Sequence, residues 1–291
     1  MHTWGKRIFA VAAPLLLTGC LWGPGKFASD LTLKKDGNFI LDYKGEIVLQ
    51  TPPDAEAKVE PWKNEFLRCH KDGSTRVLTS VQGSMQVTEE PPPGEDSVRP
   101  CTAAELAKAK GEYEKQSAER VKSKREDAEN MAKMFGLPGF DDESARAFAT
   151  KLGKYAGYRS VTYRGKGVYD VDYHFEGRAT QDFVFPALPD NDVIIPFIAI
   201  RRRADGSVFV NAPAFTGGAG PLGARAGAAA ASQMKDGPVS RAQGRFTIVT
   251  DGEIATNNSE DGTSPHALGK QVHWEVGPGS SKIPEALVRL Q

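Results

Sequence analysis

The sequence predicts an α+β protein, in which an antiparallel β-sheet is combined with one long charged helix and one shorter helix. Strand-like segments open the chain, two helical segments follow, and several further strand-like segments complete it, an order typical of α+β folds. The dipeptides Asp36-Gly37 and Asp205-Gly206 each join two strand-like runs, which is the pattern of antiparallel hairpins. A hydrophobic content of 40% in 291 residues is sufficient to build a core.

The first 19 residues have the pattern of a secretory signal peptide. Two basic residues precede ten apolar residues, Ile8 to Leu17, and Thr18-Gly19-Cys20 follows. Leu17-Thr-Gly-Cys20 resembles the bacterial lipobox, in which the residue after the cleavage site is cysteine because only a thiol takes the thioether-linked diacylglycerol. The resemblance implies that residues 1–19 are a lipoprotein signal peptide and that Cys20 is the lipidated first residue of the mature protein. The alternatives are an ordinary signal peptide and a transmembrane anchor, although a span needs about 20 apolar residues.

Residues 20–29 are expected to be a short membrane tether that keeps the folded part of the chain close to the membrane. Two or three acyl chains hold a protein firmly, and Trp22 and Phe27 suit the lipid interface, where aromatic rings are favoured. In the sorting rule known for Gram-negative lipoproteins, a residue other than Asp after the lipidated cysteine directs the protein to the outer membrane, and Leu21 is such a residue. We therefore expect a lipid-anchored protein of the bacterial cell envelope, at the periplasmic face of the outer membrane rather than at the inner membrane.

Residues 30–291 are expected to form a single α+β domain, which opens with a hairpin between Leu31 and Leu49. If Cys20 is lipidated, Cys69 and Cys101 are the remaining cysteines. An oxidising compartment favours a disulfide between them, which closes a Pro-rich insertion at residues 69–101. For a closed loop of about 30 residues, the chain-entropy model gives roughly 3–4 kcal/mol of stabilisation. The alternative is a metal-binding or redox pair, for which the sequence offers no Cys-x-x-Cys or histidine spacing.

A long helix is predicted over residues 102–135. Thr102 and Glu105 form a capping box at its start, and Gly136 is suited to end it. The first 33 residues of this segment include eight basic and seven acidic residues, so the helix has only a thin apolar stripe.

This stripe, which includes Leu106, Tyr113 and Val121, leaves two interpretations open. The helix is either a surface helix that lies across a sheet, or a docking surface for an envelope protein partner.

The second half of the chain changes from helical to strand periodicity. A shorter helix is predicted from Asp141 to about Tyr155. Strands are predicted over residues 161–163, 168–176, 180–186, 194–201, 208–212, 246–249 and 272–276. Residues 217–243 are expected to form a flexible loop or lid, because 12 of the 15 residues from 217 to 231 are Gly or Ala.

Three groups of short motifs resemble the LppM-like family of bacterial cell-envelope lipoproteins. They are the lipobox followed by Leu31-Thr-Leu-Lys-Lys-Asp-Gly-Asn-Phe39; Gly165-Lys166-Gly167 with its following strand; and Phe246-Thr-Ile-Val-Thr-Asp-Gly-Glu-Ile254 with Thr256-Asn257-Asn258 and Gly269-Lys-Gln-Val-His-Trp274. The family is similar in fold to lipid-binding proteins. The resemblance therefore implies a curved sheet with helices around an apolar cavity, and it brings no catalytic motif.

Apolar residues close to the predicted lid are candidates for binding a lipid or another apolar ligand. They are Phe183, Phe185, Ile194, Ile195, Phe197, Ile198, Phe215 and Leu222. The same residues also suit ordinary core packing, so the sequence leaves both interpretations open.

Four polar residues, Asp170, Asp172, His174 and Glu176, alternate along one predicted strand and therefore share one face. They suit either a divalent cation or the solvated face of an ordinary sheet. Because residues at i and i+2 are about 7 Å apart along a strand, one metal ion would need ligands from a second element. We predict a solvated face and no metal site.

Arg201, Arg202 and Arg203 stand at the end of an apolar strand, just before a predicted turn. They are candidates for contact with anionic lipid head groups. The alternative is a solvated hairpin end.

The sequence contains no HExxH, GxSxG or P-loop motif. Ser232-Gln-Met-Lys235 matches the S-x-x-K pattern of some serine acyl-enzymes, but no S-x-N or K-T-G motif follows, so we predict no catalytic residue and no cofactor. A formal net charge of zero argues against a nucleic-acid partner. We expect a non-enzymatic, membrane-anchored, periplasm-facing lipoprotein that binds a lipid or other apolar ligand. The alternatives are a structural or assembly lipoprotein that docks an envelope protein through helix 102–135, and a hydrolase whose site the sequence does not reveal.

Overall fold

The computed structural model describes residues 22–50, 58–77, 98–134, 136–187, 196–217 and 241–290. The chain divides into two compact units rather than the single domain expected for residues 30–291. One, here called the sheet unit, comprises Met1–Pro52 and Glu129–Gln291, and the other, the disulfide unit, comprises Pro53–Ala128. The expected insertion therefore belongs to a unit with a small core of its own.

The described residues form strands, one short 3-10 helix and two α-helices. In chain order they are β1 (Trp22–Leu33), β2 (Asn38–Leu49), η1 (Asn64–Phe66), β3 (Leu67–His70), β4 (Thr75–Val77), β5 (Val98–Arg99), α2 (Ala103–Met134), α3 (Asp142–Leu152), β6 (Tyr158–Gly165), β7 (Val168–Arg178), β8 (Phe183–Phe185), β9 (Ile198–Arg202), β10 (Val208–Asn211), β11 (Gln243–Thr250), β12 (Glu253–Asn257), β13 (Thr263–His266), β14 (Gly269–Val276) and β15 (Glu285–Arg289).

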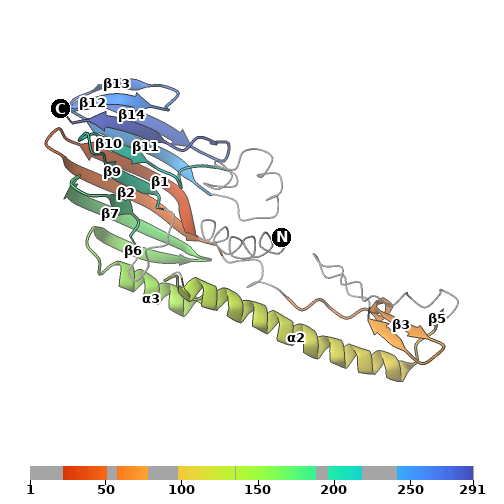
Figure 1. Cartoon of the computed structure of the whole chain (residues 1–291). Coiled ribbons are helices and arrows are strands. Elements are labelled where there is room, and N and C mark those ends of the chain that lie inside the picture. Colours follow the sequence, from red (N-terminus) through yellow and green to blue (C-terminus); the bar gives the residue numbers. More distant parts are fainter. Residues whose placement is uncertain are drawn as a thin grey trace, which may run out of the picture. The chain divides into compact units, whose positions relative to one another are not determined.

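The fold is α+β, and its sheets are mostly antiparallel, as predicted. A seven-stranded sheet has the order β13-β14-β11-β1-β2-β7-β6, and a five-stranded sheet has the order β12-β15-β10-β9-β8 (Figure 1). The expectation of a purely antiparallel sheet is wrong at one pair, because β1 and β11 are parallel. More than 190 residues separate these strands in the sequence, which leaves ample chain for the crossover that parallel pairing requires.

The predicted opening hairpin is confirmed, and it is longer than expected. β1 pairs antiparallel with β2 from Trp22↔Leu49 to Leu33↔Phe39. Gly37 has a φ of 83°, which glycine adopts readily, and Asn38 N donates to Asp36 Oδ1 at 2.9 Å.

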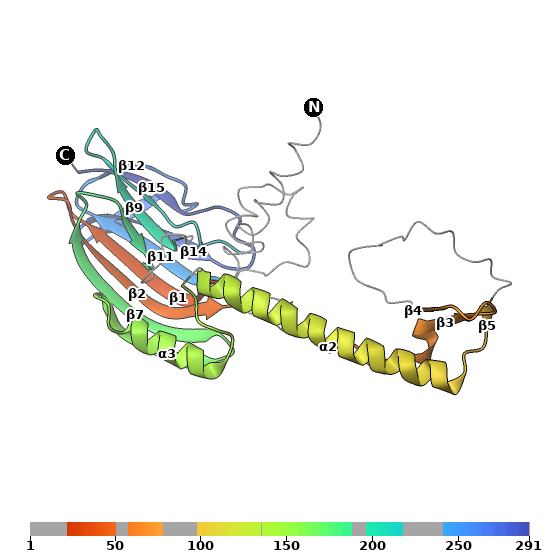
Figure 2. The same cartoon turned by 60° about the horizontal axis from the view of Figure 1, so that its bottom comes forward.

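The main core lies on the inner face of the seven-stranded sheet, against the five-stranded sheet and α3. Leu31 and Leu41 from the larger sheet and Ile198 and Val210 from the smaller one are fully buried in one cluster. Helix α3 runs beside β6 (Figure 1), on the side of the sheet that carries β7 in Figure 2. It buries Phe148 against Trp22, with the ring centroids 5.8 Å apart. The inward positions of both sheets thus alternate with outward ones, as expected for strands with one wet face.

Helix α2 confirms the long helix predicted over residues 102–135. Thr102 N donates to Glu105 Oε2 at 2.9 Å, and Glu105 N donates to Thr102 Oγ1 at 3.3 Å, so the capping box is formed at the start. At the other end, Gly136 has a φ of 64°, and Leu137 N donates to Ala132 O at 2.9 Å. Among the described residues, no helix combines the length and apolar character that a membrane span requires.

Candidate functional site

Five of the eight predicted ligand-binding residues lie in the part of the chain that the structure describes. They are Phe183, Phe185, Phe197, Ile198 and Phe215. Ile194, Ile195 and Leu222 lie outside the described residues, as does most of the predicted lid at 217–243.

Four of these five residues are brought together between the two sheets. Phe185, Phe197, Ile198 and Phe215 are all 0% exposed. The ring of Phe185 lies 5.9 Å from that of Phe197 and 4.4 Å from that of Tyr173 on the facing sheet. The three phenylalanines therefore belong to a continuous layer of packed aromatic rings, which we call the aromatic layer (Phe27, Tyr43, Tyr173, Phe185, Phe197, Phe215 and Phe246).

The aromatic layer reaches the surface beside β8, the edge strand of the five-stranded sheet. Phe183 is only partly buried, and its ring stacks on that of Phe175, with centroids 4.9 Å apart. Phe39, which is 2% exposed, lies 5.1 Å from Phe183 by ring centroid and closes the inner side of this group. We call Phe39, Phe175 and Phe183 the edge cluster. Phe39 and Phe175 were missed as candidates, although the period-two pattern of residues 168–176 places Phe175 on the apolar face.

The two tyrosines of the aromatic layer are uncharged at neutral pH. Burial raises the pKa of Tyr173 to about 12, and it also raises the pKa of Tyr43, whose hydroxyl donates to Glu46 O at 2.7 Å. An interior without charge suits an apolar guest better than a polar one.

Trp22 and Phe27 do not lie where the sequence analysis places them. Both were expected at a lipid interface, but Trp22 is 3% exposed and Phe27 is 7% exposed. Trp22 packs near Phe148 of α3, and Phe27 stacks on Phe215 with centroids 4.1 Å apart. The reason is that β1 begins at Trp22, so residues 22–29 of the expected tether belong to the sheet and its inward side chains enter the core.

The three consecutive arginines are exposed, and each contacts a nearby residue of the sheet unit. Arg201 lies 3.6 Å from Asp182, Arg202 donates to Ala179 O at 3.2 Å, and Arg203 lies over the ring of Phe209. Arg202 lies close to Gly37, since a Cβ placed on this glycine would be 3.8 Å from the guanidinium group of Arg202. The three arginines are therefore at the end of the sheets that carries the turn between β1 and β2.

The row of polar residues on β7 faces outward, as predicted. His174 is flanked by Asp42 at 2.8 Å and Glu176 at 3.3 Å, and Asp172 pairs with Lys44 at 3.5 Å. The hydrogen bond to Asp42 raises the pKa of His174. In the described residues, no group of three or more His, Cys, Asp or Glu side chains is arranged to hold a metal ion.

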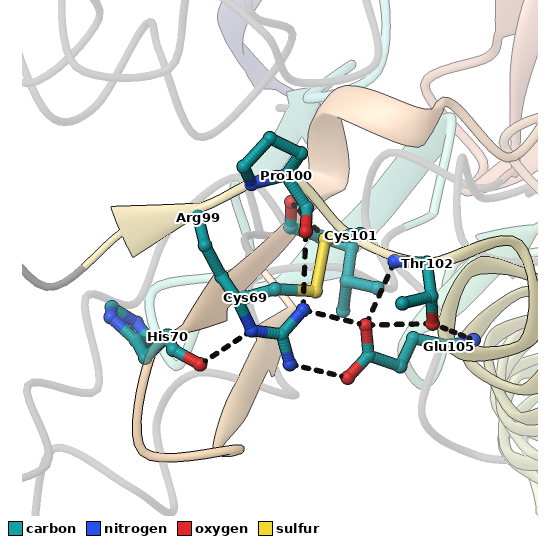
Figure 3. Close-up of a disulfide and its surroundings, with 8 residues drawn as sticks. Cys69, His70, Arg99, Pro100, Cys101, Thr102 and Glu105 are labelled. Carbon is teal, nitrogen blue, oxygen red and sulfur yellow. Dashed lines mark hydrogen bonds and ion pairs between the residues drawn. A yellow bond between two sulfur atoms is a disulfide. The ribbon is translucent and has the colours of Figure 1, made fainter.

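The disulfide unit contains the predicted Cys69–Cys101 pair, which the structure confirms with an S–S distance of 2.11 Å. Beside it, Arg99 makes two hydrogen bonds to Glu105, at 2.7 and 3.0 Å, and a third to His70 O at 3.0 Å (Figure 3). The hydrogen bonds from Arg99 and Thr102 lower the pKa of Glu105 to about 2. The capping box, the disulfide and Arg99 thus form one structural junction, in which the role of Arg99 was not predicted.

Within the disulfide unit, aromatic side chains cover the central residue of the apolar stripe of α2. Tyr113 is 7% exposed, and its ring lies 5.3 Å from that of Trp62 and 6.0 Å from that of Phe66. Leu106 and Val121 are partly buried.

The Asn-containing turn and the Val-x-Trp strand quoted for the LppM-like resemblance meet in the structure. Asn258 Oδ1 accepts hydrogen bonds from Trp274 Nε1 at 2.9 Å and from Glu285 N at 3.0 Å, and Asn258 Nδ2 donates to Ile283 O at 2.7 Å. Since Trp274 belongs to the seven-stranded sheet and Glu285 to the five-stranded one, Asn258 links the two sheets. We call Asn258 and its three hydrogen bonds the joint between the sheets, and we assign it a structural role.

Comparison of the sequence with protein-family models gives no match, and comparison with curated proteins gives none. The functional argument therefore depends on the residues of this chain and on their geometry.

Proposed function

We propose that this chain is a non-enzymatic, membrane-anchored lipoprotein that faces the periplasm and binds a lipid or another apolar ligand between its two sheets. The proposal includes a curved seven-stranded sheet as one wall of the ligand site, as the resemblance to LppM-like lipoproteins implies. The observation that carries it is the aromatic layer, which continues from the fully buried interior to the edge cluster at the surface, because the ring of Tyr173 lies 6.4 Å from that of Phe175 by centroid.

The lipobox supports the membrane anchor. Cleavage before Cys20 would leave one residue, Leu21, between the lipidated cysteine and the first residue of β1. A lipid anchor on Cys20 would therefore hold the sheet unit directly at the membrane, where apolar ligands are concentrated. The periplasmic face of the outer membrane is the proposed location.

The edge cluster supports a route for the ligand. Phe175 and Phe183 are the partly exposed rings of a group whose third member, Phe39, is buried. An acyl chain that displaced water from these rings would gain about 25 cal/mol for each Å² of apolar surface buried. An acyl chain that entered at β8 would next reach Phe185, which is two residues further along the same strand.

The test is native mass spectrometry of the full protein purified from membranes in mild detergent. We expect a non-covalently bound lipid in stoichiometric amount, and we expect Phe183→Asp to reduce its occupancy at least about tenfold, because a carboxylate is costly to desolvate beside an acyl chain. The matched control is Val184→Asp, since Val184 lies next on the same strand, points to the opposite face and is already 39% exposed.

Two outcomes would contradict the proposal. One is a folded wild-type protein that carries no such lipid and takes up none when it is added. The other is an equal loss of lipid in Phe183→Asp and Val184→Asp, which would mean that the edge cluster has no special role.

A second proposal is an assembly role in which helix 102–135 docks an envelope protein. The observation in its favour is that Val121 and Ala128 are only partly buried on an otherwise exposed, charged stretch of α2. Photo-crosslinking from position 121, with the covered position 113 as control, separates the two proposals.

A further inference from the structure

We infer that a charged cleft at the Trp22 end of the sheet unit binds the phosphate groups of anionic phospholipids in the membrane that carries the anchor. This inference rests on the proposed lipidation of Cys20. It concerns which end of the sheet unit meets the membrane and which residues make the contact.

The position of this end follows from strand register. Trp22 pairs with Leu49 across β1 and β2, and Leu49 N donates to Gly167 O at 2.8 Å. Strands lie about 4.8 Å apart, so the turn between β6 and β7 is roughly 10 Å from Trp22 across the sheet. Cys20 is two residues before Trp22 and therefore within about 7 Å of it, even with the chain fully extended.

The opposite end of the sheet unit is far from the anchor. β1 has 12 residues, so it spans about 36 Å between Trp22 and Leu33. Arg202 lies beyond this, near Gly37. An anchor at Cys20 thus disfavours Arg201, Arg202 and Arg203 as the head-group contact and points to cations at the Trp22 end.

A cleft of about 600 Å³ lies at the Trp22 end. Its walls come from β2, the start of α3, the turn between β6 and β7, and the residues just before β11, and they include Glu46, Asp142, Arg164, Lys166, Asp170 and Arg241. Arg241 belongs to this end because β11 runs parallel to β1, with Gln243 opposite Lys26.

The carboxylates of this cleft are already engaged. Glu46 accepts from Lys26 N at 2.9 Å, Asp142 accepts from the Tyr163 hydroxyl at 2.8 Å, and Asp170 pairs with Arg164 at 2.6 Å. In contrast, no carboxylate of the described residues lies within ion-pair distance of Lys166 or Arg241. Glu46 and Asp142 keep their negative charges when they accept hydrogen bonds from neutral donors, but Asp142 also lies 3.5 Å from Arg146. Since Asp142 and Asp170 each have an arginine beside them, Lys166 and Arg241 exceed Glu46 by one positive charge, which suits a phosphate group.

The backbone holds Lys166 at the tip of the turn. It is the only non-glycine residue among those described that has a positive φ, 52°, and it lies between Gly165 and Gly167, with φ of 96° and 72°. Such a conformation is unfavourable for lysine, and residues held in this way are frequent at ligand contacts. The turn is held to the neighbouring strand, because Gly167 O accepts a hydrogen bond from Leu49 N, and only glycine fits at position 167, where a Cβ would overlap Leu49 O.

The experiment is lysine footprinting by mass spectrometry on the full lipidated protein in vesicles, with a water-soluble amine-modifying reagent. Vesicles of phosphatidylcholine alone are compared with vesicles that also contain phosphatidylglycerol. We expect phosphatidylglycerol to slow the modification of Lys166 by at least about fivefold, given the attraction of basic residues to anionic surfaces. Lys34 and Lys35, exposed in the turn at the opposite end, serve as internal controls and should react at an unchanged rate.

Two variants and a soluble anion serve as further controls. Arg241→Gln should reduce the protection of Lys166, whereas Arg203→Gln, at the opposite end, should not. Equal reactivity of Lys166 in both kinds of vesicle, or equal protection of Lys34, would overturn the inference. Protection by inorganic phosphate in detergent to the same degree as by vesicles would also overturn it, because it would assign the cleft to a free anion.

Vesicle flotation separates this inference from the proposed function. Protein that fails to float with vesicles contradicts the lipid anchor itself. Protein that floats while Lys166 stays unprotected leaves the anchor intact and contradicts only the contact at the cleft.

Discussion

At the residue scale, Glu105 joins three features of the disulfide unit. Its carboxylate accepts hydrogen bonds from Arg99 and from Thr102 N, next to the Cys69–Cys101 bond. Arg99 is the largest cause of the pKa of about 2, against an ordinary value of 4.5. A carboxyl group whose pKa is lower in the folded state stabilises that state above its unfolded pKa, and this contribution is lost as the pH falls toward 2.

Glu105→Gln is therefore expected to destabilise the disulfide unit at pH 7. It should also flatten the decrease in stability that the wild type shows between about pH 4.5 and pH 2. Hydrogen exchange of β3 and the first turns of α2, measured across this pH range, reports on the unit alone. Glu65→Gln is the control, since Glu65 has only a 3.9 Å contact with the exposed Lys63, and a parallel response of the two variants would refute the role given to Glu105.

At the element scale, local signals predicted the strands and helices well, and long-range pairing was not predictable. The Asp-Gly turn of the first hairpin and the capping box of α2 are confirmed because each depends on residues a few positions apart. The parallel pairing of β1 with β11 was missed, as were β12 and β15, since these depend on partners distant in the sequence. β13 was also missed although it forms a tight hairpin with β14, because Thr263-Ser-Pro-His266 has no apolar alternation and contains a proline.

The start of β1 shows why the expected tether was wrong. Pro24 and Gly25 are residues that usually interrupt strands, so residues 20–29 look irregular in the sequence. The structure accommodates them with a register shift between Pro24 and Phe27, after which pairing with β2 continues. The sequence also could not distinguish a ligand site from a core, because inward aromatic residues such as Phe185 have the same sequence pattern in a packed core and around a ligand.

The joint between the sheets gives a prediction at this scale. Asn258→Ala removes three hydrogen bonds and leaves Trp274 Nε1 and Glu285 N without their acceptor. We expect a loss of about 1–3 kcal/mol in the free energy of unfolding. Urea unfolding followed by tryptophan fluorescence measures it. The neighbouring Asn257→Ala, which removes a single hydrogen bond from Ser259 N, should cost less, and the reverse order would contradict the joint.

At the scale of the whole molecule, very little chain separates Cys20, the proposed site of the lipid anchor, from the sheet unit. β1 enters the core at Trp22, two residues after Cys20, so lipidation would fix the sheet unit at the membrane by its Trp22 end. The exposed arginines at 201–203 would then face away from that membrane. The edge cluster lies at the same far end, because Phe39 pairs with Leu33 and Phe183 with Ile200, so the ligand route proposed there would open away from the anchor. The proposal for the charged cleft depends on this arrangement, whereas the proposed ligand site does not.

The most direct test is the mass of the N-terminal peptide of the mature protein, purified from cell membranes. We predict that the chain begins at Cys20 and that this peptide carries a diacylglyceryl group, alone or with a further acyl chain. A Cys20→Ser variant should keep residues 1–19 and lose the lipid. A mature chain with an unmodified cysteine, or one that begins elsewhere, would contradict the account.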